Sequence, residues 1–380
     1  MSTGSHRIHF IDFFRGFAVV LMILGHTIDS LLDLGSRSTH WFEVYNFLRG
    51  FTAPAFLFVS GLAFAVATEK KWNEYTHFSP ALRKRFGRVC LLFCIGYAIH
   101  LPYFSLQKSL VASTPTEIAC FFKTDVLQCI AACLLILHVI ILLLRTPAGF
   151  TRVVSALTGL IVFSTPFIWA TDLAPTFSSV LSPFMNDKPL SVFPLFPNAA
   201  FMFCGVVTGH FFAKAAKENR MGEFIVSLGI VSAVCAVAGV LFDLLPVTPY
   251  PAHDFWKTSP LFFLLRMAGV VQLTIFFYTL RRIPERLQFH LTALGQSSLL
   301  IYSVHILMVY GSAANAGLLQ LVGQTQTVEV AVGAGFAMLF LMLGLAHGWD
   351  YLRSKHFVTS QYFQAGLAGV VLYLFLLRPF

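Results

Sequence analysis

Four ionisable side chains stand in one apolar stretch near the start of the chain, IDFFRGFAVVLMILGHTIDS, residues 11–30. Asp12 and Arg15 can form an ion pair one helical turn apart, and His26 can act as a general base near neutral pH. Asp29, or another carboxylate on the outer side, could hold the imidazole in one tautomer. These residue types suit the removal of a proton from a hydroxyl or an amine. Because hydrocarbon disfavours such side chains, each of the four is a candidate for a functional role.

The polar side chains of this stretch share one face of a helix, since each residue turns it by about 100°. They are Asp12, Arg15, His26, Asp29 and Asp33. A purely structural interpretation explains the ends, because Asp12 and Arg15 could pair at a membrane boundary while Asp29 and Asp33 already lie in water. It does not explain His26, which lies about 16 Å of helical rise beyond Arg15. We therefore interpret His26 as functional.

The whole chain has the composition of a membrane protein. Of its 380 residues, 57% are hydrophobic and 11% charged, and the mean hydropathy is +0.75. A soluble fold could not bury that much apolar surface. Long apolar runs such as LLILHVIILLLR favour helices over the weaker alternating strands of a β-barrel. We predict an all-α polytopic membrane protein with about eleven transmembrane helices, at residues 13–33, 44–68, 86–107, 125–144, 151–171, 197–213, 222–245, 260–280, 294–312, 327–347 and 359–377.

The basic residues predict how the helices are oriented. They gather in every second loop and are sparse in the others; the basic loops are residues 69–88, 145–152, 214–220, 281–286 and 353–355. The positive-inside rule then predicts a cytoplasmic N-terminus and an extracytoplasmic C-terminus. The net charge of +9 follows from this bias, so we predict no nucleic-acid partner.

The chain shows no linker or repeat, which predicts a single domain over residues 1–380. The first apolar stretch is too long and too charged for a cleaved signal peptide, and we expect a permanent helix. The seven cysteines lie almost all within predicted spans, and their odd number suggests packing residues more than disulfides. No cluster has metal-ligand spacing, and no phosphate loop or G-x-S-x-G motif is present.

The second predicted span contains residues that could admit a close neighbour. Pro54 and Gly61 interrupt it, and Ser60 and Gly61 are small enough for close packing by another helix or a ligand. His40 precedes this span in a predicted outer loop. It could approach the outer end of the first helix, although a loop histidine is more often simply solvated.

Two later spans carry polar residues that could line a cavity. Asp125 and Gln128 fall in the first turn of the fourth span, where Thr124 could cap the helix beside a favourably placed Asp125. Tyr302 and His305 share one face of the ninth span with Ser298. Such groups often only join helices, yet a second intramembrane histidine favours a shared polar cavity.

Arg266, in SPLFFLLRMAG, is a further charge within a span. We expect an anionic partner for it, from the protein or from a ligand.

The stretch RIHFIDFFRGFAVVLMILGH resembles the opening of the transmembrane acyltransferases, in which an Asp, an Arg-Gly pair and a polar residue eleven positions after that Arg recur. Five later blocks resemble, in order, the family typified by heparan-α-glucosaminide N-acetyltransferase and its bacterial relatives. They are APAFLFVSGLAFA, FFKTDVLQCIAACLLIL, FPLFPNAAFMFCGVVTGHFF, SPLFFLLRMAGVVQL and LGQSSLLIYSVHILMVYG.

This resemblance implies acetyl-CoA or another acyl-CoA as cytoplasmic co-substrate, no permanently bound cofactor, and a sugar or polysaccharide acceptor on the far side of a bacterial inner membrane. The active histidine of the heparan enzyme lies in the loop before the second helix and corresponds to His40. The position of His26 is an asparagine there but a histidine, taken as catalytic, in bacterial O-acyltransferases. This chain carries both, so either could be the base.

From these inferences we predict three groups of site residues. The catalytic residues are His26, His40 and Asp29; the acyl-CoA-binding residues are Arg15, Asp12, Ser60 and Arg266; the cavity-lining residues are Asp125, Gln128, Tyr302 and His305. Direct transfer and an acyl-histidine intermediate both remain open. A transporter or flippase, and a catalytically inactive sensor, are the alternative functions. The predicted partners include the lipid bilayer and a second copy in a homodimer.

Overall fold

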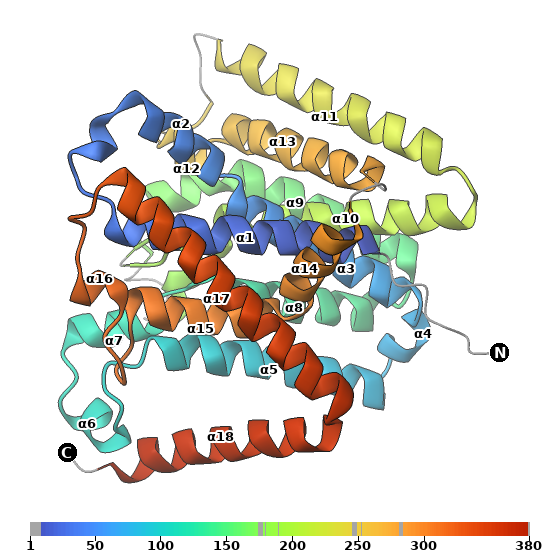
Figure 1. The fold of residues 1–380 in the computed structure, drawn as a ribbon. Helices are drawn as coiled ribbons and strands as arrows, with labels where there is room; N and C mark the ends of the chain where they lie inside the picture. The colour runs from blue at the N-terminus through green and yellow to red at the C-terminus, as the bar shows by residue number, and fades with distance from the viewer. Residues whose placement is uncertain are drawn as a thin grey trace. The chain divides into compact units, whose positions relative to one another are not determined.

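A computed structural model describes residues 9–173, 178, 180–188, 190–244, 249–251, 253–280 and 284–378. Within these residues the chain is helical, with isolated bridges and no strand. This confirms the all-α class. The longer helices of the chain include α1 (His9–Leu31), α8 (Val126–Leu144), α10 (Leu195–Lys217) and α17 (Val328–Lys355), which Figure 1 labels. Residues 281–283, part of one basic loop, lie outside the described residues.

Nine helical segments in the described chain are long and apolar enough to cross a membrane. Besides the four helices above they are α2 (His40–Arg49) with α3 (Thr52–Glu69), α9 (Pro147–Ala170), α11 (Met221–Asp243), α13 (Pro260–Thr279) and α18 (Phe357–Leu377).

Two of the eleven predicted spans differ from a simple apolar helix. The predicted span 294–312 is a pair, α14 (Glu285–Gln296) and α15 (Ser298–Tyr310), bent by 77°. The predicted span 86–107 corresponds to α5 (Pro80–Ile99), whose first half carries four basic residues, Arg83, Lys84, Arg85 and Arg88. A helix was predicted correctly in both places, but the bend between α14 and α15 was not predicted.

The helices divide into two compact units, each built from segments far apart in the sequence. The first unit comprises Met1–Thr52, Ala98–Phe121 and Leu280–Phe380, and the second comprises Ala53–Tyr97 and Phe122–Thr279. The prediction of one domain over residues 1–380 stays a prediction.

In the first unit, α1 lies against α14, α15 and α17 (Figure 1). Two glycines allow the closest approach. A Cβ atom on Gly16 would lie 1.9 Å from the carbonyl oxygen of Leu291, and one on Gly295 would lie 2.2 Å from that of Asp12. The backbones of α1 and α14 therefore touch, which fixes the N-terminal half of α1.

The C-terminal end of α1 is held by an apolar cluster. Ile28, Leu31 and Leu32 are buried with Ala331 of α17, and Phe42 and Tyr45 of α2 pack against them. Directly after α1, Leu32 forms an isolated β-bridge with Gln326, which lies just before α17. These contacts hold both ends of the polar face of α1.

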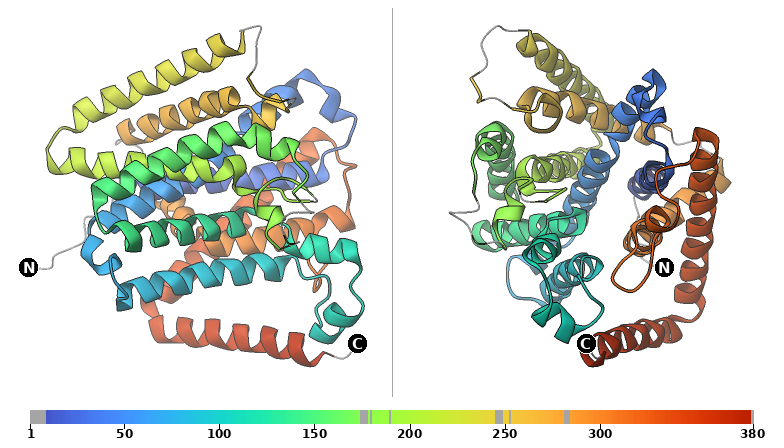
Figure 2. Two further views of the ribbon diagram at one scale, coloured as in Figure 1. Left: turned by 180° about the vertical axis from the view of Figure 1, so that it is seen from behind. Right: turned by 90° about the vertical axis from the view of Figure 1, so that its left-hand side faces the viewer.

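In the second unit, α3 and α10 cross closely. A Cβ atom on Gly61 would lie 1.9 Å from the carbonyl oxygen of Met202, and one on Gly205 would lie 2.0 Å from that of Phe58. Gly61 thus admits another helix, as expected. The pairs α9 with α10 and α11 with α13 lie side by side in the views of Figure 2.

Candidate functional site

The polar face of α1 meets a second histidine inside the first unit. His26 Nδ1 lies 3.0 Å from His305 Nε2, although 279 residues separate them in the chain. The rings are nearly parallel, at 9°, with their centroids 5.3 Å apart. His305 is fully buried, whereas His26 is partly exposed. The two intramembrane histidines therefore form one hydrogen-bonded pair.

A backbone carbonyl determines which nitrogens carry protons in this pair. The Nδ1 atom of His305 lies 2.8 Å from the carbonyl oxygen of Ile301, which can only accept a hydrogen bond, so Nδ1 must donate. Burial favours the neutral form of His305, which leaves its Nε2 as an acceptor. His26 must then donate from Nδ1. The basic lone pair of a neutral His26 is consequently on Nε2, the nitrogen that could take up a proton.

Two tyrosines of α15 frame the histidine pair. Tyr310 meets His26 edge-on, with ring centroids 5.7 Å apart, and Tyr302 meets His305 in the same way at 5.6 Å. Tyr302 is also buried, and its predicted place in the lining of a cavity stays a prediction. Aromatic edges at these positions limit how far the imidazoles can rotate.

Asp29 contacts arginines, whereas we expected it to orient His26. Its Oδ1 atom lies 3.2 Å from Arg37 Nη1, and its Oδ2 atom lies 3.0 Å from Arg49 Nη1. Arg37 also donates to the carbonyl oxygen of Asp29. The orienting contact that we assigned to Asp29 comes instead from His305, and Asp29 ties the loop after α1 to α2.

The cytoplasmic end predicted for α1 shows the expected ion pair. Arg15 Nη1 lies 3.7 Å from Asp12 Oδ1. The same nitrogen lies 3.5 Å from the carbonyl oxygen of Gly295, at the close crossing with α14. Arg15 keeps about one fifth of its side chain exposed, so its guanidinium can still meet a ligand.

His40 is placed differently from His26. It is the first residue of α2, its side chain is 89% exposed, and its Nδ1 atom lies 3.2 Å from Glu43 Oε2. A histidine with a carboxylate neighbour is a possible base in chemical terms. The structure gives it no shielding from solvent.

The other residues assigned to acyl-CoA have local partners in the second unit. The hydroxyl of Ser60 donates to the carbonyl oxygen of Phe56, at 2.7 Å. The guanidinium of Arg266 lies over the ring of Phe262, 4.2 Å from its centroid. We expected an anionic partner for Arg266; the contact observed is a cation–π interaction.

Asp125 and Gln128 belong to the second unit, and Tyr302 and His305 to the first. Asp125 is itself the N-cap of α8 and accepts from the backbone N–H of Val126, so our assignment of the cap to Thr124 was wrong. Gln128 is fully buried, and neither polar atom of its amide has a hydrogen-bond partner among the described residues. It lies against Gly96 of α5.

Sequence reasoning missed the residues that hold this site in place. It singled out Asp29 but did not predict the ion pairs of Asp29 with Arg37 and Arg49. It also gave no structural role to Gly16 or Gly295, which allow α1 and α14 to touch. A signal was present, because a carboxylate in an apolar stretch requires a cation. Which cation it meets depends on how the loop folds back.

The fold and this histidine pair define a class, a polytopic helical membrane protein with ionisable groups buried in its spans. Residues 7–241, more than half of the chain, match the model of the family described as heparan-alpha-glucosaminide N-acetyltransferase, catalytic. The chain therefore belongs to this acyltransferase family. No curated protein matches the chain.

The matched residues contain His26 and His40 but end within α11. Arg266, Tyr302 and His305 lie beyond them. The resemblance of the last two sequence blocks to the family therefore stays a prediction.

Proposed function

We propose that the protein transfers an acetyl or other short acyl group from cytoplasmic acyl-CoA to a hydroxyl or amine of an extracytoplasmic sugar. Membership of the acyltransferase family supports acyl transfer. The hydrogen-bonded chain from His26 through His305 to the carbonyl of Ile301 is the observation that carries the assignment of the base.

His26 acts as the general base in this proposal. Its Nε2 atom takes the proton of the acceptor hydroxyl or amine while the acceptor attacks the carbonyl carbon of the thioester. The carbon–sulfur bond then breaks, and the CoA thiolate receives that proton from His26. His305 accepts the Nδ1 hydrogen bond throughout, which keeps the imidazole in the productive tautomer.

The donor is proposed to reach His26 along α1. Arg15 lies eleven residues before His26 on the same helical face, and a guanidinium binds phosphate oxygens well. The phosphates of CoA would bind near Arg15 while the extended pantetheine arm brings the thioester toward His26. Asp12 holds the Arg15 side chain in place.

A small pocket of the first unit supports an acceptor site beside the histidine pair. It has a volume of about 200 Å³, and His100, Glu117, Ser312 and Gln320 line it together with Tyr310. Tyr310 also contacts the ring of His26. Hydroxyl, carboxylate and amide groups beside an aromatic ring suit the hydroxyls and the apolar face of a sugar.

The cellular setting proposed here is a bacterial inner membrane, with the N-terminus in the cytoplasm. The asymmetry of basic residues supports this orientation, because the basic loops would then face the compartment that supplies CoA. A homodimer is part of the same proposal.

The function is tested with protein purified into lipid nanodiscs. Radiolabelled acetyl-CoA is supplied with a panel of oligosaccharides, and label in the glycan and free acetate are measured. Transfer to at least one glycan supports the proposal. If the protein neither transfers nor hydrolyses acetyl groups, yet moves sugars across liposome membranes, it is a transporter.

A further inference from the structure

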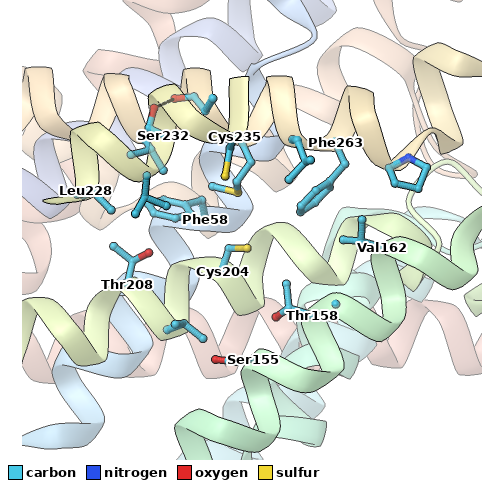
Figure 3. Close-up of a pocket in the computed structure, with 18 of the residues that line it drawn as sticks. Phe58, Ser155, Thr158, Val162, Cys204, Thr208, Leu228, Ser232, Cys235 and Phe263 are labelled. Carbon is cyan, nitrogen blue, oxygen red and sulfur yellow. Dashed lines mark hydrogen bonds between the residues drawn. The ribbon is translucent and has the colours of Figure 1, made fainter. Parts of the chain in front are cut away.

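A second cavity lies within the second unit, where α9, α10, α11 and α13 come together beside α3. Its volume is about 330 Å³. Figure 3 shows Phe58, Val162 and Phe263 among its lining residues, and Cys204 and Cys235 pointing into the same space. It shares no lining residue with the smaller pocket that Tyr310 lines in the first unit. This cavity is therefore a separate feature of the chain.

Two of the four hydroxyl side chains that line this cavity, those of Thr158 and Ser232, are hydrogen-bonded within the protein. Thr158 Oγ1 donates to the carbonyl oxygen of Val154 at 2.8 Å. Ser232 Oγ donates to the carbonyl oxygen of Ala268 and accepts from the amide of Gln272. Because these two hydroxyls have protein partners and most of the lining is apolar, the cavity favours an apolar occupant.

The exposure of α9 and α11 indicates what surrounds the opening of the cavity. In the most apolar 18-residue stretch of each candidate membrane span, 11% of α11 and 28% of α9 is buried. Phe163 of α9 and Val231 of α11 line the cavity, and both are 58% exposed. Exposed apolar side chains on membrane spans face lipid tails. The opening between α9 and α11 therefore faces hydrocarbon.

We propose that this cavity binds one acyl chain of a bilayer phospholipid, which enters between α9 and α11. An apolar space of this size does not hold water well, and leaving it empty forfeits dispersion contacts with its lining. The bilayer supplies alkyl chains at high concentration on the exposed side. The proposal is independent of the transfer reaction and of the role of His26.

Gly159 offers a direct test of this lipid site. It lines the cavity, and a Cβ atom at this position would meet no atom within 4 Å. Gly159→Leu should fill part of the cavity without displacing the backbone. Gly333→Leu is the matched control, because a Cβ atom on Gly333 also has open space around it in a candidate membrane span, and Gly333 does not line the cavity.

The readout is photolabelling by a phospholipid with a diazirine near the end of one chain, followed by peptide mapping in nanodiscs. Wild type and Gly333→Leu should be labelled on cavity-lining peptides of α10 and α13. Gly159→Leu should lose about tenfold of that labelling, since excluding two methylene groups has an effect of this size. Equal labelling of all three proteins at these peptides would overturn the proposal.

Two further outcomes would assign the cavity to another occupant. Stronger labelling by a long-chain acyl-CoA with the same diazirine than by the phospholipid would assign it to the donor substrate. If the lipid probe labels the cavity in nanodiscs that hold one protein chain but not in those that hold two, a second copy of the chain covers the cavity. That result would assign the cavity to a protein–protein contact.

The wild-type protein gives a second measurement, which needs no variant to fold. Cys204 and Cys235 line the cavity, whereas Cys90 is exposed on α5. Adding phospholipid to delipidated protein in detergent should slow alkylation of Cys204 and Cys235 by an apolar maleimide, but not that of Cys90. An equal effect on all three thiols, or none, would contradict the proposal.

Discussion

His26 of α1 and His305 of α15 form a hydrogen bond of 3.0 Å between His26 Nδ1 and His305 Nε2. The backbone carbonyl of Ile301 sets the direction of this bond by accepting from the other nitrogen of His305. His305 thus has for His26 the orienting role that a carboxylate has in a serine protease triad. A neutral partner allows this role within a membrane span, where a carboxylate would cost more free energy.

Replacing His305 should separate orientation of the base from packing. His305→Phe keeps a ring but removes the acceptor for His26 Nδ1, and kcat should fall by about 10²-fold or more. His305→Gln retains an acceptor oxygen and should recover part of that loss. Acetyl transfer by both variants is compared with that of wild type at matched thermal stability. Equal activity of the two variants would argue against an orienting hydrogen bond.

Replacing Asp29 should impair stability more than chemistry. Asp29→Asn removes a carboxylate that holds Arg37 and Arg49, and all three side chains are less than one third exposed. We expect a lower Tm in detergent, equivalent to about 1–3 kcal/mol. Glu223→Gln is the control, because its pair with Arg220 is solvent-exposed and its loss should leave Tm unchanged. An unchanged Tm with lost activity in Asp29→Asn would return Asp29 to the catalytic group.

Replacing Gln128 should have the opposite effect on stability. Both polar atoms of its buried amide lack a partner within the described chain, and such groups cost about 1–3 kcal/mol. Gln128→Leu should therefore keep or raise Tm, while acyl transfer falls if the amide serves the substrate. Gln320→Leu should lower Tm, because Gln320 accepts from the backbone N–H of Gly317. A marked drop in Tm for Gln128→Leu would show that its amide has a structural partner.

Acid should weaken the segment before α7 (Pro115–Phe122) through Glu117. The backbone N–H of Thr114 first, and then the hydroxyl of Tyr103, hold the pKa of Glu117 below its ordinary value. This stabilisation is complete above the ordinary glutamate pKa, and it is lost as the pH falls through the lower pKa of the folded protein. Wild type should exceed Glu117→Gln in Tm at neutral pH, and the difference should vanish in acid. A difference that is constant across pH would contradict this linkage.

The helices were predictable from the sequence because each one is a long, continuous run of apolar residues, which can be recognised without knowing any tertiary contact. The shared polar face of Asp12, Arg15 and His26 also follows from helical periodicity alone. The partner of His26 does not, because it depends on how α15 packs on α1. The sequence marked His305 as polar and intramembrane, but no local pattern places it 3.0 Å from His26.

The remaining differences also come from tertiary structure. The bend between α14 and α15 falls at Ser297, although the two helices together are apolar enough to be one membrane span. Asp29 has two arginine partners because the loop after α1 folds back over it. A sequence shows that a buried charge needs a partner; which residue supplies it depends on long-range packing.

The central claim is that His26, oriented by His305, is the base for acyl transfer. The most direct measurement is single-turnover transfer of radiolabelled acetyl from acetyl-CoA to glycan by wild type, His26→Ala and His40→Ala in nanodiscs. We expect His26→Ala to lower the rate by about 10² to 10⁴-fold and His40→Ala by less than about tenfold. Transfer that survives His26→Ala but is lost in His40→Ala would contradict the account and place the base at the exposed start of α2.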